Sequence, residues 1–231
     1  MTQSTIYKHN IRLDEGDDDD DDDNPEEQPA TRPEDAPMFP GSDTNAMSMW
    51  ARKSDELFYK RRAVYLWGAV TDTTAKDVVN KLLLLDADKP GEEIRFFINS
   101  PGGVVTSGMV MYDVIKMIKS PVSTICMGLA ASMGSILLSA GVKGRRFIFP
   151  HGEVMIHQPS LGGYMQGVSA DLEIQAIQIA KTKELGGKIL AENCGQDFEK
   201  VMRDLERDYW MDAQESIKYG IVDGVLDKLD Y

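Results

Sequence analysis

Short apolar runs alternate with stretches of helical periodicity from residue 63 onward. The runs at residues 63–67, 94–99 and 122–126 are bounded by turn-forming or polar residues, which is typical of buried strands. Between the first two runs, residues 73–85 carry apolar side chains at the spacing of one helix face, with candidate N-caps at residues 71–73. The repeated order of strand, turn and helix predicts an α/β fold in which helices cover parallel strands.

The same pattern predicts the elements of the second half of the chain. Helices are expected at residues 107–118, 132–140, 169–192, 198–207 and 213–219, and strands at residues 146–149, 154–157 and 221–225. Gly128 is expected to turn the chain between the strand at 122–126 and the helix that Ser132 opens. The pair Gly186 and Gly187 is expected to weaken the long helix.

Residues 1–45 differ in composition from the rest of the chain. They carry 14 acidic and 3 basic residues, a net charge of −11 out of −13 for the whole chain, and five of its ten prolines. Asp17 to Asp23 is an unbroken run of aspartates, which repel one another and offer no apolar surface to bury. We therefore expect a disordered acidic tail at 1–45 and a globular domain at 46–231. A tail that binds a metal or a partner, and a removable propeptide, are the alternatives.

Charge and hydropathy exclude several classes of protein. Residues 46–231 carry a net charge of only −2, so the basic footprint of a nucleic-acid-binding protein is missing. The sequence has no apolar run of about 18 residues and no signal-peptide or transit-peptide pattern, so we expect a cytoplasmic protein without a membrane span. Cys126 and Cys194 are too few for a disulfide framework and are expected to be structural thiols, with Cys126 buried. Because phosphate-binding and zinc-binding motifs are missing, we expect no ATPase activity of its own and no cofactor.

Ser132 stands where a nucleophile would be expected. In Gly128-Leu-Ala-Ala-Ser-Met-Gly-Ser135 an apolar strand ends and a serine opens a helix, whose first backbone N–H groups lack partners within the helix. The amide of Met133 could therefore face a developing oxyanion. Small residues here would also let a helix pack closely on a sheet, and the motif alone favours that structural interpretation.

A serine nucleophile needs a base, and the chain has three histidines. His9 lies in the tail, and His151 follows a proline in a polar turn, where a surface position is expected. His157 ends a predicted strand and is the candidate base, although a half-buried structural histidine fits this position too. The acid that would orient the imidazole is left open by the residues alone among four aspartates, Asp204, Asp208, Asp212 and Asp223.

The turn at residues 99–103, Asn-Ser-Pro-Gly-Gly, directly follows a predicted strand. Its proline and glycines force a sharp bend and leave backbone amides uncovered by side chains. Such a turn can supply a second oxyanion donor, or it can be an ordinary connection between a strand and a helix.

Five segments together resemble the proteolytic subunits of ATP-dependent Clp proteases, the ClpP family. In order, they are Phe97-Ile-Asn-Ser-Pro-Gly-Gly103, Gly128-Leu-Ala-Ala-Ser-Met-Gly-Ser135, Val154-Met-Ile-His-Gln-Pro159, Glu206-Arg-Asp-Tyr209 and Tyr219-Gly-Ile-Val-Asp223. The resemblance implies a crotonase-like spiral of ββα units with a protruding handle helix. It also implies a serine endopeptidase with the triad Ser132, His157 and Asp208 and an oxyanion hole formed by the amides of Gly103 and Met133.

The resemblance further implies an assembly. Members of this family form a tetradecamer of two stacked heptameric rings, into which Clp-family AAA+ ATPases thread unfolded proteins. The helix from Ser169 and the segment at 159–167 would form the contact between the rings. The partner would use the ATP, so no cofactor is implied for this chain. Residues 47–51 do not follow the apolar start that is usual in the family, and the 159–167 segment is slightly longer than usual.

Two other functions fit parts of the same sequence. A crotonase-type acyl-CoA enzyme would use two oxyanion amides with carboxylates, but it would not need the pair of Ser132 and His157. A non-catalytic structural subunit of a mixed ring would keep the fold without the activity.

Overall fold

The computed structural model describes residues 44–160 and 168–229, with side chains from residue 49 onward. The predicted tail, apart from its last two residues, and most of the 159–167 segment lie outside the described residues. The helices are α1 (Thr44–Lys60), α2 (Asp72–Asp88), α3 (Val105–Met117), α4 (Met133–Ser139), α5 (Ser169–Cys194), α6 (Phe198–Asp204) and α7 (Ala213–Tyr219). The strands are β1 (Ala63–Trp67), β2 (Ile94–Ser100), β3 (Val122–Ala131), β4 (Arg146–Ile148), β5 (Glu153–Ile156), β6 (Tyr209–Met211) and β7 (Gly224–Val225).

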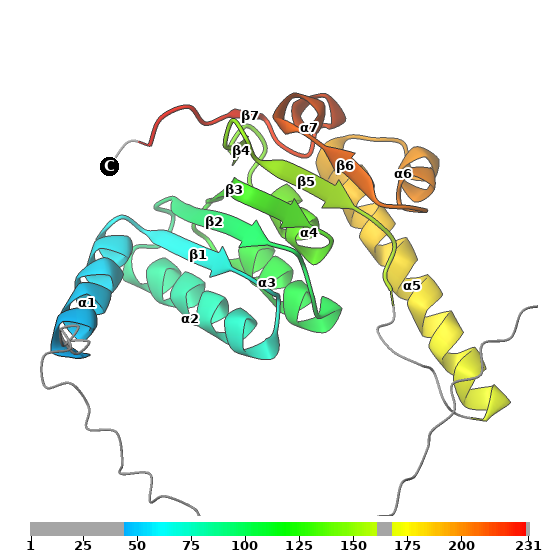
Figure 1. Cartoon of the computed structure of the whole chain (residues 1–231), viewed down its shortest axis with the longest axis horizontal. Helices are drawn as coiled ribbons and strands as arrows, with labels where there is room; N and C mark the ends of the chain where they lie inside the picture. Colours follow the sequence, from blue (N-terminus) through cyan, green and yellow to red (C-terminus); the bar gives the residue numbers. More distant parts are fainter. Residues whose placement is uncertain (1–43, 161–167, 230–231) are drawn as a thin grey trace, which may run out of the picture. The chain divides into compact units, whose positions relative to one another are not determined.

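A sheet lies at the centre of the described chain. Strands β1, β2, β3, β4 and β7 are hydrogen-bonded neighbours in that order, and every pair among them is parallel (Figure 1). Strand β3 is long enough to pair with β4 along its first half and with β5 along its last three residues. Strand β6 is antiparallel to β5. The predicted α/β fold, with parallel strands and covering helices, is therefore confirmed.

Both faces of this sheet bury side chains. On one face, alternate residues of β1 and β2, such as Leu66 and Phe96, join Leu82 of α2 in the main core, where each is at most 1% exposed. On the other face, Tyr65 stacks on Phe97 with ring centroids 4.8 Å apart, and Phe58 of α1 packs against Tyr65 at 4.5 Å. Strand β2 thus has apolar residues on both faces, which explains why its sequence reads as a continuous apolar run.

The prediction that Gly128 turns the chain is wrong, because β3 continues through it to Ala131. The register between β2 and β3 shifts along the way: Ile98 lies opposite Cys126, but Ser100 lies opposite Ala130. Two extra residues of β3 are therefore accommodated in a bulge around Gly128. The chain bends only after β3, at Ser132, which is the N-cap of α4.

Other differences arise where packing outweighs local preference. Helix α5 continues through Gly186 and Gly187. A Cβ at Gly187 would lie 2.5 Å from the sulfur of Met202, so a larger residue would not fit there. Glycine there lets α5 pack closely on α6. Helix α6 ends three residues before the predicted end, and β7 covers only the last two residues of the predicted strand. Helix α1 and strand β6 were not predicted.

Helix α5 is the longest helix of the described chain, with 26 residues. Its buried residues all lie in its last nine positions, and Figure 1 shows its first half extending beyond the sheet. Within the described residues, no helix combines the length and apolar character needed to cross a membrane.

A buried ion pair fixes the C-terminal segment to β4. The Arg146 side chain, 2% exposed, donates from Nη2 to Oδ1 of Asp223 at 2.6 Å and from Nε to Oδ2 at 2.9 Å. Burial works to raise the pKa of Asp223, but hydrogen bonds from Arg146 and its charge outweigh burial and hold the pKa below its ordinary value. A carboxylate whose pKa is lowered by folding stabilises the protein above its unfolded pKa.

We predict that Asp223→Asn lowers the free energy of unfolding at pH 7 by about 2 kcal/mol, because it leaves the charge of Arg146 buried and unbalanced. The difference from the wild type should shrink as the pH falls from about 4, the pKa of an aspartate in the unfolded chain, towards the lowered pKa of folded Asp223, because the unfolded wild type takes up the proton first. Urea unfolding at several pH values measures it. The exposed Asp227→Asn is the control, and an equal effect of both substitutions would contradict the prediction.

Candidate active site

Ser132 occupies a strained position between β3 and α4. Its backbone has φ 53° and ψ −120°, a conformation that residues other than glycine rarely adopt. The strain is held by backbone hydrogen bonds on both sides: the N–H of Ser132 donates to Met155 O at 2.8 Å, and its carbonyl accepts from the N–H of Ser135 at 3.0 Å. The turn directs the hydroxyl towards His157, as in a nucleophile elbow.

His157 is brought to Ser132 by the pairing of β5 with β3. Ala131 lies opposite Met155 in this parallel pair, so that the residues just beyond the two strand ends are neighbours. Nε2 of His157 lies 2.9 Å from Oγ of Ser132, a hydrogen-bonding distance. The His157 side chain is 23% exposed, which leaves the ring accessible to a substrate.

Asp208 is brought to His157 by strand β6. In the antiparallel pair of β5 and β6, Ile156 lies opposite Tyr209, which sets residue 157 beside residue 208. Oδ1 of Asp208 lies 3.0 Å from Nδ1 of His157. The structure therefore joins Ser132, His157 and Asp208 in one chain of two hydrogen bonds.

The other three aspartates considered as candidates are engaged elsewhere. Asp204 accepts a hydrogen bond from the hydroxyl of Tyr219 at 3.0 Å. Asp212 is the N-cap of α7, and Asp223 is paired with Arg146. Of the four aspartates that the residues left open, Asp208 is the one hydrogen-bonded to the histidine.

The glycine turn after β2 lies directly against Ser132. A Cβ at Gly102 would lie 2.7 Å from Cβ of Ser132 and 2.9 Å from the backbone nitrogen of Met133, so only glycine fits. The turn is held by Val70, whose N–H donates to Gly102 O and whose carbonyl accepts from Val104. Among the described residues, the N–H groups of Gly103 and Met133 have no hydrogen-bond acceptor. Two unpaired donors thus flank the serine, and Gly102, which the sequence analysis did not single out, allows their approach.

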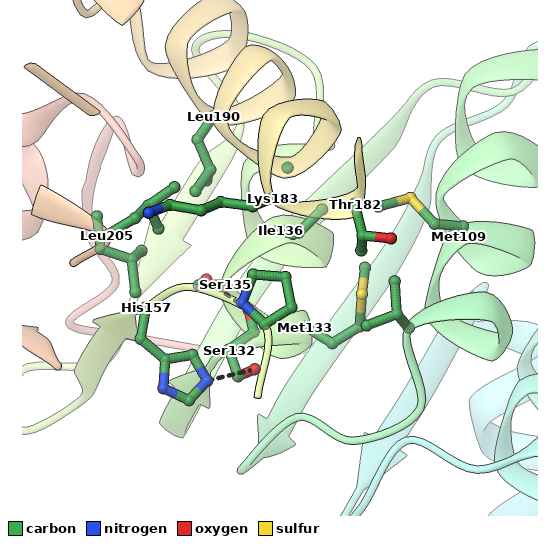
Figure 2. Close-up of a pocket in the computed structure, with 14 residues that line it drawn as sticks. Met109, Ser132, Met133, Ser135, Ile136, His157, Thr182, Lys183, Leu190 and Leu205 are labelled. Carbon is green, nitrogen blue, oxygen red and sulfur yellow. Dashed lines mark hydrogen bonds between the residues drawn. The ribbon is translucent and has the colours of Figure 1, made fainter. Parts of the chain in front are cut away.

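A mainly apolar pocket opens beside the serine. Figure 2 shows His157 and Ser132 at one side, Met109 and Met133 at the other, and residues of α5 reaching in from above. The residues that line it are Val105, Met109, Ser132, Met133, Ser135, Ile136, Ile156, His157, Pro159, Thr182, Lys183, Gly186, Leu190 and Leu205. Such a pocket suits an apolar side chain held next to the nucleophile.

A set of contacts holds the segment that carries Asp208. Lys183 of α5 forms an ion pair with Glu206 at 2.8 Å. A hydrogen bond and the charge of Lys183 hold the pKa of Glu206 below its ordinary value. Gln158 donates from its backbone to Leu205 O at 2.7 Å and from its side chain to Glu206 O at 3.0 Å. Gln158 and Glu206 belong to two of the five quoted segments, but the sequence did not indicate this role, because it depends on which segments meet.

The remaining candidates play no part in this arrangement. His151 is exposed in the turn before β5, as expected. Both cysteines are buried, as the structural interpretation requires. Burial raises the pKa of Cys126 to about 11 and that of Cys194 to about 12, so neither forms a thiolate readily at neutral pH.

The strain at Ser132 gives a test of the backbone geometry. Ser132→Gly and Ser132→Ala both remove the hydroxyl, but only glycine adopts φ 53° without strain. We predict that the glycine variant unfolds with a free energy about 1 kcal/mol higher than the alanine variant, after allowance for the greater freedom of glycine in the unfolded chain. Urea unfolding of the two variants side by side measures the difference. An alanine variant of equal or greater stability would contradict the strained geometry.

Comparison with known protein families agrees with this geometry. The family model described as Clp protease matches residues 47–229, which is most of the chain and includes all the residues of the site. The resemblance seen in five short segments is therefore confirmed over the whole described domain. The chain belongs to the Clp protease family, as a ClpP-type protease.

Proposed function

We propose that this chain is the proteolytic subunit of an ATP-dependent Clp protease, a serine endopeptidase with the triad Ser132, His157 and Asp208. The observation that carries the proposal is the continuous path from Ser132 Oγ to His157 Nε2 at 2.9 Å and from His157 Nδ1 to Asp208 Oδ1 at 3.0 Å. Membership of the Clp protease family supports peptide hydrolysis as the reaction.

In this mechanism Asp208 keeps a proton on Nδ1 of His157, so that Nε2 is free to accept the proton of the Ser132 hydroxyl. The serine oxygen then attacks the carbonyl carbon of the scissile bond and forms a tetrahedral intermediate. His157 returns the proton to the leaving amine, and an acyl-enzyme forms. Water, deprotonated by His157, attacks the acyl group in the second half and releases the new carboxylate and the serine.

The oxyanion of each intermediate would be bound by the amides of Gly103 and Met133. Their lack of acceptors among the described residues, and the close approach of Gly102 to Ser132, support this assignment. The pocket beside the serine would hold an apolar side chain of the substrate next to the scissile bond.

The proposal extends to the assembly. The chain would form two stacked heptameric rings and receive unfolded proteins from a Clp-family AAA+ ATPase in the cytoplasm, with ATP used by that partner and no cofactor of its own. Helix α5 would serve as the handle between rings, because its projecting half exposes Ile174 (65% exposed) and Ile177 (50%), side chains that a partner ring would cover. The spiral of ββα units and the acidic tail or propeptide at residues 1–45 belong to the same proposal.

The two alternative functions make different demands on the site. An acyl-CoA enzyme would need no hydrogen bond between a serine and a histidine, and the bond between Ser132 and His157 favours the peptidase. A non-catalytic subunit would not react with a fluorophosphonate, which labels activated serines.

We predict that Ser132→Ala abolishes hydrolysis of a fluorogenic peptide and labelling by a fluorophosphonate, because the attacking oxygen is lost. The variant should still form particles of the same native mass, since the one hydrogen bond of the hydroxyl within the described residues is to His157. Ser54→Ala, on helix α1, is the matched control and should keep full turnover. Activity that survives in Ser132→Ala would reject the nucleophile, and an unlabelled wild type would favour the non-catalytic alternative.

We also predict that Asp208→Asn lowers kcat by about 10²-fold or more, because the amide no longer selects the productive tautomer of His157. Its effect on KM should be small, since Asp208 lies on the far side of the imidazole from Ser132. Steady-state kinetics measures both constants, with the exposed Asp113→Asn of α3 as control. A kcat close to that of the wild type would remove Asp208 from the mechanism.

A further inference from the structure

Strands β2 and β3 do not keep one register along their length. Ile94 to Ile98 lie opposite residues 28 positions later in the chain, as in the pair Ile98 and Cys126, whereas Ser100 lies opposite Ala130, 30 positions later. The shift takes place at a single residue of β2, Asn99. Everything after Asn99 therefore lies two residues further along β3 than an unbroken ladder would place it.

The side chain of Asn99 occupies the bulge that this shift creates. Its Oδ1 accepts a hydrogen bond from the backbone N–H of Leu129 at 3.2 Å, which supplies an acceptor where the ladder between the strands is interrupted. Gly128 leaves the space for it, because a Cβ at Gly128 would lie 3.2 Å from the same oxygen. The main chain of Asn99 is held independently, since its carbonyl accepts from the N–H of Gly68 at 2.8 Å.

The shifted register decides what meets Ser132. With the offset of Ser100 and Ala130 continued, Gly102 falls opposite Ser132, which is where the structure has it, at the approach that only glycine allows. With the offset of Ile98 and Cys126 continued, Gly102 would fall opposite Ala130, two residues before the serine. The Gly103 amide would then no longer lie beside the serine, and the Met133 amide, which follows the serine in the chain, would be left without its partner donor.

We propose that Asn99 is a positioning residue of the active site: its side chain holds the bulge in β3 and thereby sets the Gly103 amide beside Ser132. This inference rests on the proposed peptidase function for its kinetic consequence. Asn99 itself acts through the backbone of Leu129 and contacts no residue of the proposed triad. Because a misplacement of about 1 Å costs about 10²-fold in rate, a hydrogen bond that fixes the register bears directly on turnover.

The test compares two substitutions of nearly equal size. Asn99→Leu removes the acceptor, and Asn99→Asp keeps an oxygen that can accept from Leu129. We expect Asn99→Leu to lower kcat by about 10²-fold, with KM within about twofold, because the oxyanion forms only after binding. The affinity for a peptide aldehyde, whose adduct carries the oxyanion, should fall in parallel with kcat. Asn99→Asp should keep most of the activity. Gln196→Leu, which loses a side-chain bond to Tyr219 O distant from the serine in the fold, is the control and should not change kcat.

A substitution in β3 tests the same contact between Asn99 and Leu129. Gly128→Ala places a Cβ 3.2 Å from Oδ1 of Asn99, which is closer than most such contacts. It should therefore lower kcat, by a smaller factor than Asn99→Leu does. If Gly128 acts through Asn99, it should have no further effect in the double variant with Asn99→Leu, so that the two effects are not additive. Should Asn99→Leu fail to fold, the other two variants test the positioning role. The role predicts a lower kcat in Gly128→Ala and most of the activity in Asn99→Asp, and an unchanged kcat in Gly128→Ala would overturn it.

The outcomes separate this inference from the proposed function. A wild type that hydrolyses peptides, together with an Asn99→Leu variant of unchanged kcat, would overturn the positioning role alone. A wild type without peptidase activity would overturn the proposed function. Hydrogen exchange of the Leu129 amide then decides the positioning role by itself: faster exchange in Asn99→Leu, with the Ser132 segment also less protected, supports it, and unchanged exchange rejects it.

Discussion

The pairing of β5 with the last three residues of β3 is the interaction on which the site depends. Strand β3 is shared, because its first half bonds to β4 and its second half to β5. This division puts the end of β5 next to the turn at Ser132, and the N–H of Ser132 completes the contact by donating to Met155 O. Strand β6 then adds to the free edge of β5 and brings Asp208 to His157. Three segments far apart in the chain thus meet through two ladders of backbone hydrogen bonds.

Backbone strain is present at the point where these ladders end. Ser132 has a positive φ, and Gly102 fits against it only because it has no side chain. Conformations of this kind cost of order 1–3 kcal/mol and persist only where the surroundings hold them. Here a rigid sheet, the bond to Met155 and the turn held by Val70 do so. The result is a serine hydroxyl and two unpaired amides fixed in place before any substrate arrives, an arrangement that favours stabilisation of charge in a transition state.

The aspartates near the C-terminus show how environment separates residues of one type. Asp223 is largely buried against Arg146 and stabilises the fold, Asp212 caps a helix, and Asp204 bonds to Tyr219. Asp208 is 60% exposed and touches the imidazole of His157. The sequence around these four aspartates offered no physical reason to prefer one as the partner of the histidine. Only the resemblance to a family pointed to Asp208, and the contact with His157 supplies the physical reason.

Local sequence patterns predicted most of the strands and helices in their order, the apolar segments of β1, β2 and the first half of β3, and the positions of Ser132 and His157 near the ends of elements. These follow from local patterns, because helices buried on one face repeat apolar residues at helical spacing and strands buried on both faces read as continuous apolar runs. The sequence by itself did not determine the path of β3 through Gly128, the continuation of α5 through Gly186 and Gly187, or the existence of α1 and β6. The path of β3, the continuation of α5 and strand β6 depend on contacts between distant segments: the bulge on Asn99, the packing of Met202 on Gly187, and the pairing of β6 with β5. The meeting of Ser132, His157 and Asp208 was likewise decided by the tertiary structure, because hydrogen bonds between strands set their distances and no local pattern encodes them.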